Sequence, residues 1–179
     1  MQPRTKLGRC YTQNNPCFSL AAFSVSVFQI RLTLGMNLTT TVEYMREQYK
    51  HFVHLKQDRM LFWLQPNFQL ALNLQSNKRD WQELTVLDGE IMSEDRYMRN
   101  VVEAKHPVLM WQALIAKLQL SFYFEFFDEA AAILREMAIT GKKGMSNFAF
   151  PLWYFFGAMT HYELYRRNRS SRKDLKHAR

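Results

Sequence analysis

Hydrophobic positions recur at spacings of three and four along nearly the whole chain, as is typical of amphipathic α-helices. Residues 18–34 and 38–56 predict two antiparallel helices joined by a tight turn. Gly35 suits the end of the first helix and Asn37 the start of the second. The second helix carries one apolar face, made of Leu38, Val42, Met45, Tyr49 and Phe52. No alternating pattern of useful length indicates a β-strand, so the sequence predicts an all-α fold with six or seven helices.

A third apolar stripe, at Met60, Leu64, Phe68 and Ala71, contains Pro66. Proline removes a hydrogen bond inside a helix, so the helix either kinks or restarts there, and we expect a kink. The periodicity then stops from Gln75 to Met92, where Asp88-Gly89 indicates a turn. This connection is long for a compact domain. The apolar residues within it predict that it folds back onto the core; they are Trp81, Leu84, Val86 and Leu87.

A short helix is expected from Ser93 to about Lys105, before His106-Pro107. Three further stripes follow. The first comprises Trp111, Leu114, Ile115, Leu118 and Phe122. The second comprises Phe127, Ala130, Ala131, Leu134 and Ala138, and the third comprises Phe150, Trp153, Phe156, Gly157, Thr160 and Leu164. Helix pairs therefore start near residues 18, 59, 108 and 147. The last two starts are 39 residues apart, within the periods of helical-repeat arrays.

Helix pairs that stack on one another explain the apolar faces better than isolated pairs do, because one pair alone cannot bury two such stripes. We therefore expect antiparallel helix pairs stacked as a tetratricopeptide-like right-handed superhelix, incomplete at its ends. Phe127 to Ala130 resembles the start of a second helix in such a unit. The expected organisation is an irregular basic N-terminus at 1–17, a helical-repeat domain at 18–167, and a basic tail or the start of a further helix at 168–179.

Charge is concentrated at the two ends of the chain. The formal net charge is +8, yet residues 10–164 hold 14 basic and 15 acidic residues. A neutral middle argues against nucleic acid as the main partner. The alternative is that the C-terminal basic run binds an anionic surface, either nucleic acid or membrane. That run consists of Arg166, Arg167, Arg169, Arg172, Lys173, Lys176 and Arg179.

The apolar stretch from Cys17 to Ile30 follows Arg4, Lys6 and Arg9, in a region of 42 residues without an acid. It is shorter than the roughly 20 residues that span a bilayer, and several polar residues interrupt it. A buried helix is therefore favoured over a targeting segment or a membrane anchor, and we expect a cytoplasmic protein. Two cysteines are too few for a disulfide framework or a zinc site.

No residue pattern indicates catalysis, so no catalytic, cofactor-binding or metal-binding residue is predicted. His51 and His54 are three apart on a helix, but a third ligand at suitable spacing is missing. His161 is expected as a hydrogen-bonded histidine near the packed face. Gly141 to Gly144 lacks the spacing of a phosphate-binding loop and is expected to end a helix. An all-α enzyme whose site combines distant residues remains an alternative.

Several short segments of the chain occur in the same order as in a known protein family. The segments are Gly35–Leu38, Lys56–Gln57, Gln69–Leu74, Leu87–Glu90, Phe124–Ala130 and Phe150–Ala158. Over residues 30–167 the series resembles the tetratricopeptide-like helical region of large multidomain signalling proteins. Those proteins also carry a serine/threonine kinase-like domain, a predicted AAA-type ATPase domain, a GAF domain and a sensor histidine kinase.

The resemblance implies a non-catalytic scaffold or interaction module in signal transduction, as a fragment or relative of such a protein. Its partners would be proteins or the other domains of a parent protein. None of the family's catalytic motifs lies in this region, so the resemblance assigns no catalytic residue.

Overall fold

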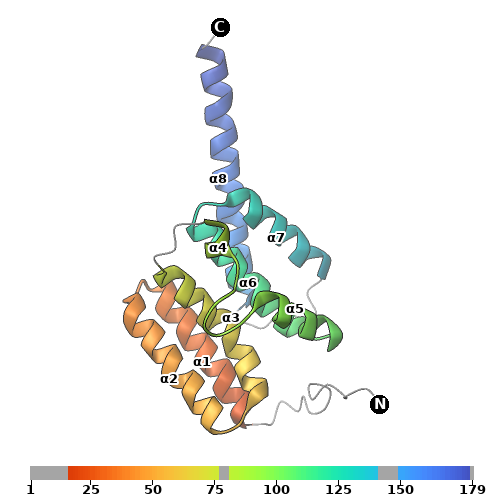
Figure 1. Ribbon diagram of the computed structural model, residues 1–179. Coiled ribbons are helices and arrows are strands. Elements are labelled where there is room, and N and C mark those ends of the chain that lie inside the picture. Colours follow the sequence, from red (N-terminus) through yellow and green to blue (C-terminus); the bar gives the residue numbers. More distant parts are fainter. Residues whose placement is uncertain (1–15, 77–80, 141–148, 178–179) are drawn as a thin grey trace.

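The computed structural model describes residues 16–76, 81–140 and 149–177, which form eight α-helices and no strand (Figure 1). The all-α prediction is therefore confirmed for this part of the chain. The predicted loop from Gly141 to Gly144 and most of the predicted N-terminal region lie outside the described residues. The helices are α1 (Pro16–Thr33), α2 (Leu38–His54), α3 (Asp58–Gln75), α4 (Trp81–Thr85), α5 (Glu94–Glu103), α6 (Pro107–Tyr123), α7 (Phe127–Thr140) and α8 (Ala149–His177).

The helices pack mainly against near neighbours in the chain. α1 contacts α2 and α3, α3 contacts α6, and α6 contacts both α7 and α8. One apolar cluster joins α1, α2, α3, α5 and α6, and a second joins α6, α7 and α8. α6 belongs to both clusters, and eleven of its 17 residues are buried. It is therefore the central helix of the molecule, with α1, α2 and α3 side by side at one end (Figure 1).

Four of the helix junctions share one turn geometry. The helices α1, α2, α5 and α6 are each followed by a residue with positive φ, namely Gly35, Lys56, Lys105 and Glu125. In each turn the amide of this residue donates to the carbonyl three residues back, and the next amide donates to the carbonyl five residues back. This pair of bonds is the Schellman motif, which satisfies the last carbonyls of a helix. Only Gly35 was indicated by the sequence, since lysine and glutamate rarely adopt a left-handed conformation.

Most residues of the predicted apolar stripes face the core, but Ala138 of the stripe predicted for α7 is exposed and Met137 is buried in its place. Val42, Met45 and Phe52 of α2 are buried, and so are Phe156, Gly157 and Thr160 of α8. α3 runs through Pro66 as one helix, so the helix does not restart there. α8 also continues without a break through residues 168–177, where the sequence predicted a basic tail or the start of a further helix. Its C-terminal half projects beyond the other helices (Figure 1).

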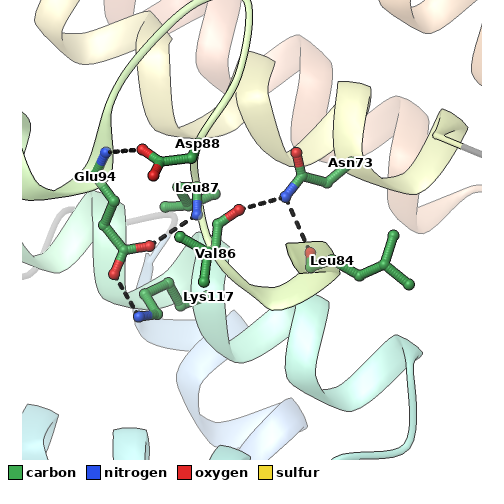
Figure 2. A network of polar contacts seen from close by, with 7 residues as sticks. All are labelled: Asn73, Leu84, Val86, Leu87, Asp88, Glu94 and Lys117. Carbon is green, nitrogen blue, oxygen red and sulfur yellow. Dashed lines mark hydrogen bonds and ion pairs between the residues drawn. The ribbon is translucent and has the colours of Figure 1, made fainter. Parts of the chain in front are cut away.

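The long connection between α3 and α5 folds back onto the core, as predicted, and polar contacts hold it there (Figure 2). From α3, the buried Asn73 donates through Nδ2 to the carbonyl oxygens of Leu84 and Val86, at 2.9 and 2.7 Å. From α5, Glu94 accepts the Leu87 amide at 2.7 Å and forms an ion pair with Lys117 of α6. The connection is therefore bonded to α3 and α5, and its own Leu87 is fully buried.

The turn at Asp88-Gly89 is held from α3 as well. Gln69 donates through Nε2 to the Asp88 carbonyl, at 3.4 Å, and its Oε1 accepts the Ile91 amide, at 3.2 Å. Gln69 is itself buried, so both ends of its amide replace the water that the connection would otherwise bind. The described part of this segment consequently packs as part of the core, with α4 as a short helix within it.

The apolar stretch predicted as a buried helix is α1, and the prediction is half right. Ala21, Val25 and Phe28 are buried against α2 and α3. The opposite side of α1 stays exposed, although its residues are also apolar. In the part of the chain that the structure describes, no helix is both long and apolar enough to cross a membrane.

Candidate interaction surface

One side of α8 is fixed to the body of the protein by aromatic packing. Phe156 is 3% exposed and meets Phe122 of α6 edge to face, with ring centroids 5.2 Å apart. Trp153 packs in the same way against Trp111, at 6.0 Å. A Cβ on Gly157 would lie 3.4 Å from Leu134 of α7, so this glycine lets the two helices approach closely. These contacts fix which side of α8 faces outward.

The outward side of α8 carries a stripe of exposed aromatic residues. Tyr154, Phe155, Tyr162 and Tyr165 are 52%, 57%, 57% and 63% exposed, and Ala158 lies exposed between them. Their spacing of three, four and seven places them along one helix face. Aromatic residues are enriched at the centres of protein interfaces, because they bury much area for little loss of side-chain entropy. The stripe, defined as Tyr154, Phe155, Ala158, Tyr162 and Tyr165, is therefore the candidate interaction surface.

The first arginines of the basic run are already engaged. Arg166 pairs with Glu163 at 2.7 Å, and this hydrogen bond raises the pKa of the Arg166 guanidinium above its ordinary value. Arg167 pairs with Glu125 at 3.1 Å, and its guanidinium lies 4.4 Å from the centre of the Phe127 ring. A guanidinium over an aromatic face is held there by cation–π attraction. Arg167 therefore braces α8 against the turn between α6 and α7, whereas the Arg166 pair lies within α8 itself.

The histidines do not come together. His51 and His54 lie exposed in the last turn of α2, and within the described residues no group of three His, Cys, Asp or Glu side chains could hold a metal ion. His106 caps the start of α6, where its Nδ1 accepts the Leu109 amide at 3.2 Å. Burial lowers the pKa of the His106 imidazole. His161 is exposed, so its predicted place near the packed face is wrong; the adjacent Thr160 is buried instead.

A chain of buried amides joins α1, α3 and α6, and the sequence did not predict it. Gln119 donates through Nε2 to Gln29 Oε1 at 3.0 Å, and Gln29 donates to Asn67 Oδ1 at 2.7 Å. Asn67 in turn donates to Gln112 Oε1 at 3.1 Å. The two inner amides, Gln29 and Asn67, each accept on one side and donate on the other, so the bonds polarise one another in the same direction. The available signal was the presence of glutamines within otherwise apolar helices.

Comparison with known proteins identifies no relative of this chain. No protein-family model, no curated protein and no solved structure matches the chain.

Proposed function

We propose that this protein is a non-catalytic helical-repeat interaction module, with helix pairs stacked in a tetratricopeptide-like superhelix. The order in which the helices contact one another along the chain supports this proposal. α1, α3, α6 and α8 follow one another in contact, while α2 and α7 each bridge two of them. Repeat arrays have this arrangement, in which each unit touches only its neighbours. The four matching turns also support it, because recurrent turns are what a repeated helix pair requires.

The observation that carries the proposed role is the exposed aromatic stripe of α8. In a stacked array, the free face of a terminal helix is where another helix packs. Ala158, the small residue of the stripe, leaves room for a partner helix to approach between the aromatic side chains. The stripe therefore suits an apolar helical segment of a protein partner or of another domain. We further propose that the module acts in signal transduction. The proteins that it resembles carry ATPase and kinase domains beside their helical region.

Site-specific photocrosslinking tests the proposed surface. A photoreactive amino acid at Phe155 should capture a discrete protein partner in cells that express the chain. The matched control is Ile139, which is 87% exposed and belongs to a different helix, α7. Equal capture at both positions would contradict a role for α8. Hydrolysis of ATP by the purified chain, absent from a heat-denatured sample, would contradict the non-catalytic part of the proposal.

A further inference from the structure

α1 exposes an apolar seam on the side that faces away from the core. The seam consists of Leu20, Phe23, Val27, Ile30 and Leu34, which follow one another at alternating spacings of three and four. Phe23 is 62% exposed, Ile30 is 47% exposed, and Leu34, one residue past the end of α1, is 72% exposed, whereas the central Val27 is half-buried. Spacing of this kind gives the period of 3.5 residues at which two helices pack side by side.

The seam lies on a helix that is apolar on its other side too. Ala21, Val25 and Phe28 already occupy the face turned to α2 and α3. A helix that is apolar all round is ordinarily buried all round, so one uncovered side is unusual. Several large apolar side chains in one row also form a larger patch than the scattered single residues that are normal on a protein surface.

We propose that the seam binds a second copy of this chain, so that two α1 helices pack antiparallel about a two-fold axis. The seam is complementary to itself in that orientation. Leu20 would lie opposite Leu34 of the second copy, Phe23 opposite Ile30, and Val27 opposite Val27 on the axis. A two-fold interface requires this property, since the same surface must fit both subunits.

Charge does not oppose a second copy at this face. The chain carries a net charge of +8, so two copies repel one another wherever basic surfaces meet. The seam has no charged residue, and α1 contains only one, Arg31. Arg31 bonds to Thr40 at 3.0 Å, and its guanidinium lies 5.5 Å from the centre of the Tyr44 ring. The seam itself therefore offers no charged side chain to a charged partner.

The antiparallel orientation also follows from charge. Arg4, Lys6 and Arg9 precede α1, and no acid occurs in the first 42 residues. A parallel pair would start the two basic segments at the same end of the interface. An antiparallel pair starts them at opposite ends of a seam about 21 Å long, from fourteen residue steps of 1.5 Å each. That separation exceeds the screening length of about 8–10 Å at physiological salt.

The size of the seam predicts a weak dimer. Two copies would bury on the order of 1,000 Å² in total, near the lower limit for a specific interface. α1 is already folded against α2 and α3, so pairing does not require a new helix to form. We therefore expect association in the micromolar range, visible as a rise from the monomer mass of 21.4 kDa toward twice that value as concentration increases.

Sedimentation equilibrium of the full chain tests the proposal. The double variant Phe23→Glu with Ile30→Glu should stay monomeric at every concentration at which the unchanged chain is dimeric. Thr33→Glu, which places a charge on an exposed position of α1 outside the seam, should leave dimerisation unchanged. Circular dichroism of each variant shows whether its helices have formed. A monomeric unchanged chain, or a dimer that survives the double variant with its helices intact, would overturn the proposal.

A cysteine on the predicted axis tests the orientation. Val27→Cys, in a chain whose Cys10 and Cys17 are replaced by serine, should form a disulfide between two copies under mild oxidation. Leu20→Cys in the same background should not, because the two copies of this residue lie at opposite ends of an antiparallel seam. Cross-linking at Leu20 but not at Val27 would overturn the antiparallel arrangement. Dimerisation only after removal of residues 1–15 would show that the chain's own N-terminal segment covers the seam, and would also overturn the proposal.

Discussion

At the scale of single residues, three of the four shared turns use a residue that is poorly suited to its conformation. Lys56, Lys105 and Glu125 have positive φ, where the side chain crowds the backbone. Glycine has no such penalty, and Gly35 already occupies the equivalent position after α1. The fold therefore tolerates local strain at these turns, and the packing of the flanking helices maintains it.

Replacing Lys56 or Lys105 with glycine should stabilise the protein by about 0.5–1 kcal/mol each. Glycine relieves the strain of the positive φ. Part of this gain is offset because glycine increases the conformational entropy of the unfolded chain. Urea denaturation measures it. Lys50→Gly, on an exposed position inside α2, is the matched control and should instead cost about 1 kcal/mol. A loss of stability at Lys56 and Lys105 would show that the lysine side chains matter more than the turn conformation.

His106 should make the stability of the protein depend on pH. Its folded pKa lies below the unfolded value of about 6.5, so the unfolded chain binds the proton more tightly. The contribution of His106 is therefore present above about pH 6.5 and is lost as the pH falls toward the folded pKa. Protonation also removes the Nδ1 acceptor that caps α6.

His106→Asn tests this, because asparagine caps a helix at any pH. The difference in unfolding free energy between variant and unchanged chain should shift in favour of the variant as the pH falls from about 7.5 to 5.5. Other titrating groups are common to both proteins and cancel. A difference that stays constant with pH would show that His106 does not titrate in this range.

At the scale of the elements, the buried amide chain fixes how α1, α3 and α6 lie against each other. Asn67 is in the middle of it and fully buried, bonded to Gln29 on one side and Gln112 on the other. A leucine in its place would leave a donor and an acceptor unsatisfied in the core. Each costs about 1–3 kcal/mol, so Asn67→Leu should destabilise the protein by at least about 2 kcal/mol.

Gln119→Leu is the matched comparison, since Gln119 stands at the end of the chain and its Oε1 has no partner among the described residues. This variant deprives only Gln29 of a partner and should cost less than Asn67→Leu when both are unfolded in urea. Equal costs would contradict the larger number of unsatisfied groups that Asn67→Leu leaves in the core.

At the scale of the whole molecule, stability should reside in the two apolar clusters that share α6. The C-terminal half of α8 projects beyond them (Figure 1). A chain that ends after Asn168 should therefore unfold with a free energy within about 0.5 kcal/mol of the unchanged chain. Thermal and urea denaturation measure this. Arg166 and Arg167 remain in that chain, so a loss above about 1 kcal/mol would mean that residues 169–179 stabilise the body.

Much of the helical pattern could be predicted from the sequence, because helix periodicity is a local property. The faces of α2, α6 and α8 were assigned correctly from residues only three and four apart, as with Val42 and Met45. The packed connection was also predicted, from Leu87 and its apolar neighbours. The positive φ of Lys56 could not be predicted from the sequence. The lysine side chain disfavours this conformation, and the packing of the flanking helices imposes it.

The exposed apolar faces of α1 and α8 depended on information that is not local. Tyr154 and Phe156 are both aromatic residues of one helix, yet one is exposed and the other is buried by Phe122. The hydrogen bond between Gln29 and Gln119 likewise joins residues 90 positions apart. The sequence by itself determined most of the helical segments and most of their apolar faces, although it did not indicate the short α4. Only the tertiary structure decided which of those faces are covered, because burial depends on contacts between residues far apart in the chain.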